Sequence, residues 1–127
     1  MLSPQPKGRK RVTVQRANRR VAAKIVRQVR AACVERDGHC RLFFGDHLHG
    51  DTQVGEGLDY CGVRSEWAHL GEKRRFKTRG MPPEERHTVQ DSLMLCDLHH
   101  DLYDGRTLNI TALSDRGANG PLEFRRL

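Results

Sequence analysis

The sequence predicts a small α+β domain that depends on a bound metal ion, with a basic helix at its N-terminal end and a β-hairpin at its C-terminal end. The chain has 127 residues, of which only 36% are hydrophobic, and it contains four Cys and seven His. A chain of this size buries roughly 65–70% of the surface that its unfolded form exposes. Because so few hydrophobic residues make a small core, we expect a metal ion to stabilise the fold.

The N-terminal part divides into an arm and a helix. Residues 1–14 contain two prolines, a glycine and many basic residues, and we expect a basic arm without regular structure. Residues 15–127 are expected to form a single domain with its core in residues 36–105. From Arg16 to Arg36 the spacing of hydrophobic residues predicts an amphipathic helix that ends at Asp37-Gly38. The hydrophobic face of this helix consists of Val21, Ile25, Val29, Ala32 and Cys33.

Shorter elements follow along the rest of the chain. Residues 41–60, rich in Gly, Asp and His, predict an irregular insertion or a loose hairpin, and residues 71–90, with two adjacent prolines, predict a long basic loop. Residues 63–70 and the hydrophobic run 93–96 fit strands, and residues 97–104 fit a short helix that Gly105 ends. Residues 107–113 and 122–126, separated by a turn sequence, predict the C-terminal β-hairpin.

The positive charge is concentrated at the N-terminal end. Residues 1–36 contain eleven basic residues and one acidic residue, a net charge of +10, so the remaining 91 residues contribute −3 to the total of +7. So dense a cationic segment attracts nucleic acid through release of counterions. The alternative without a binding partner, a solvated helix face with a disordered tail, is less favoured at this charge density. We expect DNA contacts from Arg20, Lys24 and Arg27 on the helix and from a second basic cluster of Lys73, Arg74, Arg75, Lys77 and Arg79.

Composition also bears on the compartment. No hydrophobic run approaches the ~20 residues of a membrane span, and the first residues lack the hydrophobic stretch of a secretory signal. We therefore expect an intracellular protein with no membrane partner. In a reducing compartment, its four cysteines are thiols or metal ligands and not disulfides.

The segment LCDLHHDLYDG (residues 95–105) is the most specific local feature of the sequence. Cys96 and His99 have the spacing with which a turn into a helix presents two ligands to a tetrahedral zinc ion. Cys40 and Cys61 are the candidates for the other two ligands, although 20 residues separate them. His39, His47, His49 or Cys33 are alternatives for one of these positions, and Cys33 fits the hydrophobic face of the helix better.

A second group of residues carries potential for catalysis. If residues 97–104 are helical, His100 and Asp104 lie one turn apart on the same face and can bind one ion together. His69 ends the strand in SEWAHL, and its ordinary pKa of about 6.5 suits it to take a proton from water at neutral pH. Taken alone, His69 is more often an ordinary packed histidine. Trp67, two residues earlier, lies on the same side of the strand and fits a core position.

These motifs together resemble the HNH endonuclease family. They are RDGHC (36–40), YCG (60–62), AHL (68–70), SLMLC (92–96) and CDLHH (96–100) followed by an acid, and they span roughly residues 36–105. The resemblance implies a ββα-metal (His-Me finger) core with one catalytic divalent cation, Mg²⁺, Mn²⁺, Ni²⁺ or Zn²⁺. It implies that His69 is the general base and that His100 and Asp104 bind this cation. It also implies a structural zinc ion held by Cys40, Cys61, Cys96 and His99.

The sequence departs from the family pattern at two points. The residue before the base histidine, usually a metal-binding His or Asp, is Ala68, and Glu66 is the substitute expected on the same face of the strand. At the position of the middle asparagine the chain has Asp91-Ser92, and either residue can orient the loop or the histidine.

The expected function is that of a metal-dependent endonuclease that hydrolyses double-stranded DNA and is either nicking or weakly sequence-specific. The alternative is a zinc-stabilised nucleic-acid-binding module that is inactive because of Ala68. A third class, a structural zinc protein that binds a protein partner, predicts no salt-sensitive affinity for DNA. Similar HNH proteins of phages and prophages accompany a large terminase subunit during DNA packaging, which implies that partner and the cytoplasm or nucleoid of a bacterial or phage-infected cell. No feature of the sequence indicates a dimer.

Overall fold

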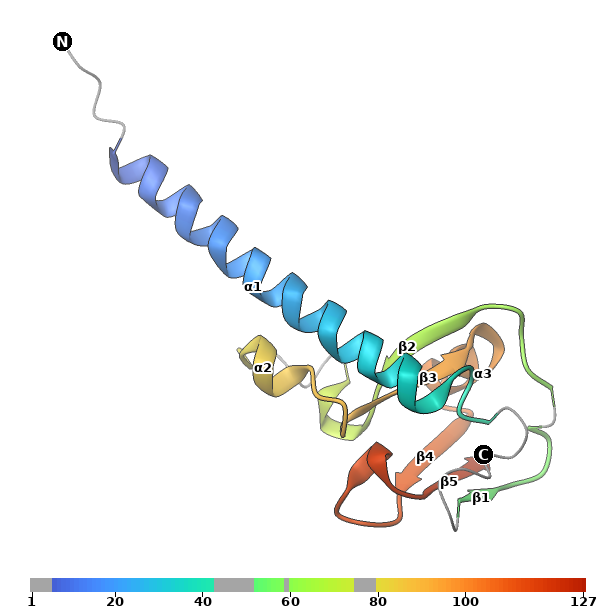
Figure 1. Cartoon of the computed structure of the whole chain (residues 1–127). Coiled ribbons are helices and arrows are strands. Elements are labelled where there is room, and N and C mark those ends of the chain that lie inside the picture. Colours follow the sequence, from blue (N-terminus) through green and yellow to red (C-terminus); the bar gives the residue numbers. More distant parts are fainter. Residues whose placement is uncertain (1–5, 43–51, 59, 75–79) are drawn as a thin grey trace.

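Two small sheets and a short helix form the body of the molecule, and a long N-terminal helix projects from it (Figure 1). The computed structural model describes residues 6–42, 52–58, 60–74 and 80–127. This arrangement confirms the mixed α+β class. No described helix combines the length and the hydrophobicity needed to cross a membrane.

The long helix, α1 (Pro6–Asp37), lies with its C-terminal part against β3 (Ser92–Cys96) and α2 (Pro83–Arg86). Cys33 is fully buried there, as its position in the hydrophobic face predicted. The helix ends at Gly38, which has a φ of 71°, and the Gly38 N–H donates to the Val34 carbonyl oxygen at 2.7 Å.

The helix starts earlier than the sequence predicted. Residues 6–14, expected in an arm without regular structure, belong to α1, and residues 1–5 lie outside the described part. Proline is well tolerated in the first turn of a helix because its missing N–H has no partner there in any case, which makes Pro6 a suitable start. The Lys, Arg and Gln residues that follow have high helix propensity, which the low hydrophobicity of this segment concealed.

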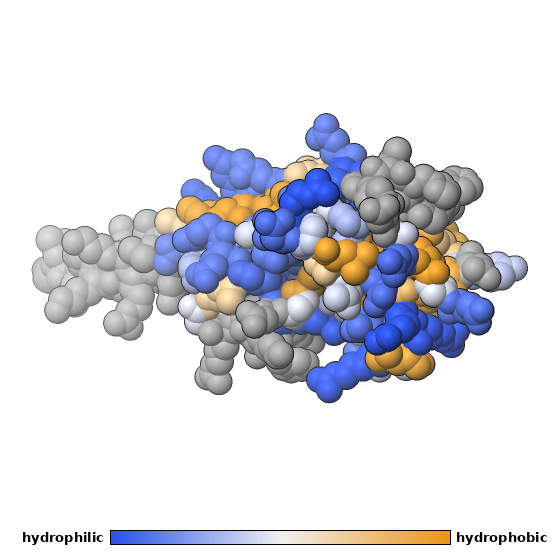
Figure 2. Space-filling view, turned by 90° about the horizontal axis from the view of Figure 1, so that it is seen from below, coloured by the Kyte–Doolittle hydropathy of each residue, from blue (hydrophilic) through white to orange (hydrophobic). Residues whose placement is uncertain are grey.

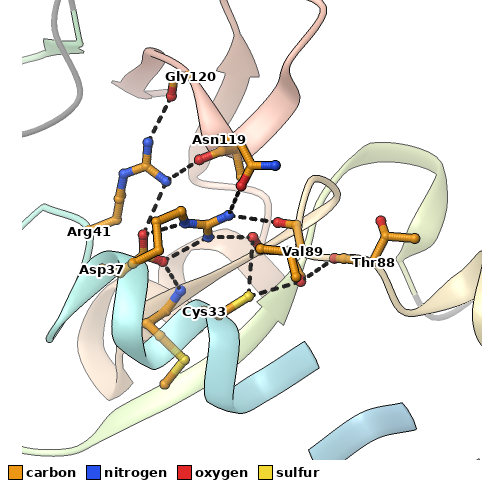
Figure 3. A network of polar contacts seen from close by, with 11 residues as sticks. Cys33, Asp37, Arg41, Thr88, Val89, Asn119 and Gly120 are labelled. Atoms are coloured by element: carbon orange, nitrogen blue, oxygen red, sulfur yellow. Dashed lines mark hydrogen bonds and ion pairs between the residues drawn. The ribbon is translucent and has the colours of Figure 1, made fainter. Parts of the chain in front are cut away.

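A buried polar network joins the end of α1 to the rest of the molecule (Figure 3). Both side chains of the Asp37–Arg41 ion pair are fully buried, and Arg36 also contacts Asp37 with a distance of 2.7 Å between Nε and Oδ1. Asp37 accepts a hydrogen bond from the backbone N–H of Met94 in β3, and Arg41 donates to the carbonyl oxygen of Ala118. The network therefore sets the direction in which the basic helix leaves the body.

Strands β2 (Ser65–His69) and β3 (Ser92–Cys96) form an antiparallel pair, and helix α3 (Asp97–Asp104) follows β3 without a loop. The helix and its end at Gly105 have the predicted bounds. Cys96 caps the helix, because its Sγ accepts a hydrogen bond from the His99 N–H at 3.3 Å. All five residues of β3 are buried, since α1 and α3 both pack against this strand.

The second sheet has the order β1-β5-β4. Its strands β4 (Leu108–Ala112) and β5 (Leu122–Arg126) are antiparallel and confirm the predicted C-terminal hairpin. Strand β1 (Gln53–Val54) adds to β5 in parallel, so residues 52–58 do not form a loose hairpin, and apart from β1 they are irregular, the other alternative for this region. A strand of two residues leaves no hydrophobic pattern in the sequence. Residues 43–51 and 59 of the expected insertion lie outside the described part.

The segment between β2 and β3 is more ordered than the predicted loop. It contains the 3-10 turn η2 (Gly71–Lys73) and the short helix α2 (Pro83–Arg86), which contacts α1. Pro83 occupies the first turn of α2, where proline is favoured. Residues 75–79, with three members of the second basic cluster, lie outside the described part.

The hydrophobic core is small and lies between the two sheets, α3 and the segment after α1. Leu93, Leu95, Leu108, Leu122 and Phe124 are each at most 2% exposed. A further 3-10 turn, η4 (Gly117–Asn119), closes the hairpin side. Seen from below, the surface is mostly hydrophilic and its hydrophobic residues form separate groups, in line with the low hydrophobic content (Figure 2).

Candidate functional site

Four potential metal ligands meet where β2, β3 and α3 join. Cys40 follows the end of α1, Cys61 precedes β2, Cys96 ends β3 and His99 lies in the first turn of α3. Their ligand atoms all lie within 4.8 Å of one another. The Nδ1 atom of His99 is 3.1 Å from the Sγ of Cys96, 3.4 Å from that of Cys40 and 3.9 Å from that of Cys61. These four residues can hold one metal ion.

The chemistry of this Cys₃His cluster fits zinc. Three thiolates and one imidazole are a common ligand set of structural zinc sites, and none of the four cysteines of the chain forms a disulfide. Cys40, Cys96 and His99 are each at most 1% exposed, while Cys61 is half-buried. Such an enclosed set leaves no open position for a substrate, which is typical of a structural ion.

Burial acts on the protonation of these ligands. Burial raises the pKa of the Cys40 thiol well above its ordinary value. Burial also raises the pKa of Cys61, and the charge of the neighbouring Cys96 raises it further. Burial lowers the pKa of His99, and a hydrogen bond to the Leu58 backbone acts in the opposite direction. A bound metal ion favours the thiolate form of these cysteines over the thiol, because it binds the thiolate and releases the proton.

The structure selects among the ligands that the sequence left open. Cys33 is buried away from the cluster, with its Sγ 3.3 Å from the Oγ of Ser92. His39 contacts the Ser65 hydroxyl through its Nδ1. His47 and His49 lie outside the described residues.

The three residues expected at a catalytic cation also come together, around the ring of His100. Its Nδ1 lies 2.9 Å from Oε1 of Glu66 in β2, and its Nε2 lies 3.5 Å from Oδ2 of Asp104, one turn along α3. The two carboxylates therefore face opposite nitrogens of one imidazole. Within the described part of the chain, the Cys₃His cluster is the one group of three or more such residues whose ligand atoms all converge on a point. His100 and Asp104 can bind an ion together, whereas Glu66 contacts the other side of the ring.

His69 lies in the same region and is half-buried at the end of β2. Its Nε2 is 2.9 Å from Nδ1 of His87, which follows α2, and its ring lies 4.4 Å from that of Trp67 between centroids. Burial, followed by the charges of His87 and Arg86, lowers the pKa of His69 from 6.5 to about 4. Burial and Arg86 also lower the pKa of His87. Both rings are therefore neutral at neutral pH. His69 can accept a proton, but it is a weaker base than the ordinary pKa of about 6.5 predicted.

An open cleft of about 1040 Å³ extends from His69 to His100 and Asp104. Trp67, His69, His100 and Asp104 line it, together with Arg86 and Arg106 on its walls. The Nε–H of Arg86 has no acceptor among the described residues. Sequence reasoning missed His87, Arg86 and Arg106, because no spacing motif links them to the residues beside which they fold.

Two residues predicted to contact DNA, Arg74 and Lys73, bind other residues of the protein. The guanidinium of Arg74 stacks on the Tyr103 ring at 3.7 Å, donates to the Tyr103 carbonyl oxygen and lies 3.8 Å from Asp104. The ammonium of Lys73 donates to the carbonyl oxygen of Glu85. Arg75, Lys77 and Arg79 lie outside the described residues, whereas Arg20, Lys24 and Arg27 are exposed on α1.

Asp91 and Ser92, which the sequence left as candidates for orienting the loop or the histidine, stabilise the turn before β3. Thr88 donates through its hydroxyl to Oδ2 of Asp91 at 2.7 Å, and Ser92 donates to the Thr88 carbonyl oxygen at 2.6 Å. The Asp91 carbonyl oxygen also accepts from the N–H of Leu70, directly after His69. Of the two roles left open by the sequence, these contacts support that of orienting the loop.

Comparisons of the chain with protein-family models, with curated proteins and with solved structures found no match.

Proposed function

We propose that this protein is a metal-dependent endonuclease of the HNH type that hydrolyses phosphodiester bonds in DNA, by nicking and with weak sequence preference. The observation that carries the proposal is the composition of the cleft. It joins a half-buried neutral histidine, His69, to a second histidine and a carboxylate, His100 and Asp104, at the spacing for one ion. Hydrolysis of a phosphodiester needs such a base and such a cation.

The order of the elements supports the proposed ββα-metal core. The antiparallel pair β2 and β3 is followed directly by α3, with the proposed base on β2 and the proposed cation ligands on α3. The Cys₃His cluster ties the beginning of β2, the end of β3 and the first turn of α3 to one point. Zinc in this cluster would keep His69 and His100 in fixed relative positions.

The residues act in the proposed reaction as follows. His100 and Asp104 would hold the divalent cation, which supplies charge stabilisation at the reacting phosphate. His69 takes a proton from the attacking water as its oxygen bonds to phosphorus. The bond from phosphorus to the leaving sugar oxygen breaks, and that oxygen takes up a proton from water. The positive charge of Arg86 at the wall of the cleft attracts the phosphate.

DNA binding is assigned to the basic face of α1. Arg20, Lys24 and Arg27 are exposed, and the helix projects from the body as an extended charged surface. Contacts of this kind bind phosphates and carry no base information, which supports weak sequence preference.

A second candidate function rests on Ala68. This residue is 2% exposed and offers no ligand at the position where the family usually binds the cation. Two protein ligands hold an ion weakly, so the same fold could serve as a zinc-stabilised nucleic-acid-binding module without catalysis.

The test is nicking of supercoiled plasmid by the purified protein with Mg²⁺, Mn²⁺ or Ni²⁺ added, against a control with EDTA. We expect metal-dependent conversion to the open circle, lost in His69→Ala without loss of DNA binding. Retained salt-sensitive binding with no cleavage in any metal would contradict the nuclease and establish the binding module.

A further inference from the structure

The side chain of His87 contacts that of the proposed base, His69. Its Nδ1 lies 2.9 Å from Nε2 of His69, although 18 residues separate the two along the chain. The two rings are 5.1 Å apart between centroids, and Trp67 lies 4.4 Å from one and 5.4 Å from the other. The ring of His69 is thus held by packing on Trp67 and by a hydrogen bond at one defined nitrogen.

This hydrogen bond decides which nitrogen of His69 can accept a proton. With Nε2 engaged by His87, Nδ1 is the remaining atom that can take a proton from water. Nδ1 is free for this role when the ring proton of His69 sits on Nε2 and is donated to Nδ1 of His87. His87 then carries its own proton on Nε2. This hydrogen bond therefore couples the tautomer of His69 to that of His87.

The charges around the pair favour neutral rings. Arg86 and His87 approach His69 from the α2 side and His100 approaches from α3, and all three disfavour a charged His69. Asp91, before β3, acts in the opposite direction. A bond between two neutral imidazoles needs one donor and one acceptor nitrogen, and the contact at 2.9 Å provides this pair.

We propose that His87 is the positioning residue of His69, which accepts the Nε2–H of His69 and leaves Nδ1 of His69 as the atom that receives the proton of the attacking water. This role of His87 rests on the proposed nuclease function and adds a positioning residue to the proposed active site. It also makes the α2 segment part of the site, since His87 follows Arg86 directly.

Two substitutions separate positioning from packing. His87→Phe keeps a ring against Trp67 and removes the acceptor. His87→Asn supplies an amide oxygen near the place of Nδ1 and removes the ring. A positioning role predicts that His87→Asn retains more activity than His87→Phe, and a packing role predicts the reverse order.

The experiment measures plasmid nicking for wild type and both variants, and records the tautomer of His69 by nitrogen NMR in the zinc-loaded protein. We expect kcat of His87→Phe to fall on the order of 10²-fold with KM unchanged, as for a reacting group displaced by about 1 Å. We expect His69 to be protonated at Nε2 in wild type and His87→Asn, and to become a mixture of tautomers in His87→Phe.

The NMR result distinguishes failure of this inference from failure of the nuclease. If wild type does not nick DNA but the Nε2–H tautomer is present and lost in His87→Phe, the positioning contact stands and the nuclease proposal fails. Wild-type kcat in His87→Phe, or a His69 tautomer that is the same in all three proteins, overturns the inference. Should His87→Phe fail to fold, a mixture of tautomers in His87→Asn overturns it as well.

Discussion

Nδ1 of His100 lies 2.9 Å from the carboxylate of Glu66, on the opposite side of the ring from Asp104. A histidine that binds a metal through one nitrogen ordinarily donates its other N–H to a carboxylate, which orients the ring. Glu66, expected from the sequence as a substitute ligand, thus has the contact of an orienting partner. In the proposed nuclease, His100, through its Nε2, and Asp104 would hold the cation.

This division of roles predicts different effects of two substitutions. Asp104→Ala should weaken the binding of the cation and so raise the concentration of Mg²⁺ or Mn²⁺ that gives half-maximal nicking. Glu66→Gln, which keeps an acceptor oxygen for the Nδ1–H, should change that concentration much less. Loss of an orienting partner altogether, in Glu66→Ala, should cost roughly 10–100-fold in metal affinity or activity.

The control for Asp104→Ala is Asp101→Ala, an exposed carboxylate on the same helix. It should have the metal dependence of wild type. An equal shift in Asp101→Ala and Asp104→Ala would show that only the overall charge of α3 matters.

The Cys₃His cluster predicts dependence of folding on zinc. Metal binding in small zinc domains contributes on the order of 10 kcal/mol, which is comparable to the whole free energy of unfolding of a domain, about 5–15 kcal/mol. Cys96→Ala should therefore be unfolded by circular dichroism and contain no zinc, and a strong chelator should unfold wild type.

Cys33→Ala is the matched control, because Cys33 is equally buried and lies outside the cluster. It should retain one zinc ion per chain by elemental analysis and lose only about 1 kcal/mol of stability. A Cys96→Ala protein that melts like Cys33→Ala would contradict a structural zinc site.

The sequence specified the local parts of the site. Cys96, His99, His100 and Asp104 lie within one strand end and one short helix, so their spacing alone predicts which face each occupies. Cys40 and Cys61 were predicted from the turn residues that flank each of them, as in zinc knuckles, although the 20 residues between them gave no spacing rule.

The contacts that were missed depend on tertiary structure. His87 meets His69 because the chain returns to the end of β2 directly after α2, and no periodicity encodes this return. Arg74 has the charge of a DNA contact, but the Tyr103 ring and Asp104 provide partners that a linear sequence does not reveal. Composition therefore shows which segments carry positively charged side chains, but it does not show whether those side chains contact DNA or other parts of the protein.

The lowered pKa of His69 predicts a pH dependence of stability. The folded protein binds a proton at His69 only near pH 4, whereas the unfolded chain binds it near pH 6.5. Between these values the unfolded state carries more protons, so this contribution to stability is complete above pH 6.5 and is lost as the pH falls towards 4. His69→Asn removes it.

The measurement is urea unfolding of the zinc-loaded protein at pH 7 and pH 5.5, followed by the fluorescence of Trp67, the single tryptophan. Wild type should lose more free energy of unfolding between the two pH values than His69→Asn, since all other titrating groups are shared. Equal losses would mean that the environment of His69 does not favour its neutral form.

The exposed basic face of α1 predicts how DNA binding responds to salt. Each phosphate contact contributes about 0.9 to the slope of log affinity against log salt concentration. The double substitution Arg20→Ala and Arg27→Ala should lower this slope by up to ~2, whereas the exposed pair Arg116→Ala and Arg125→Ala should leave it nearly unchanged. Equal changes in both proteins would show that net charge, and not α1, determines binding.

The most direct test of the central claim, that His69 is the base of a phosphodiester hydrolase, is chemical rescue of His69→Ala. Free imidazole can enter the space left by the side chain and accept the proton of the attacking water. We expect the variant to be inactive with Mg²⁺ alone and to nick plasmid at a rate that rises and saturates with imidazole concentration, while wild type does not respond. Nicking by His69→Ala at the wild-type rate without imidazole would contradict the account.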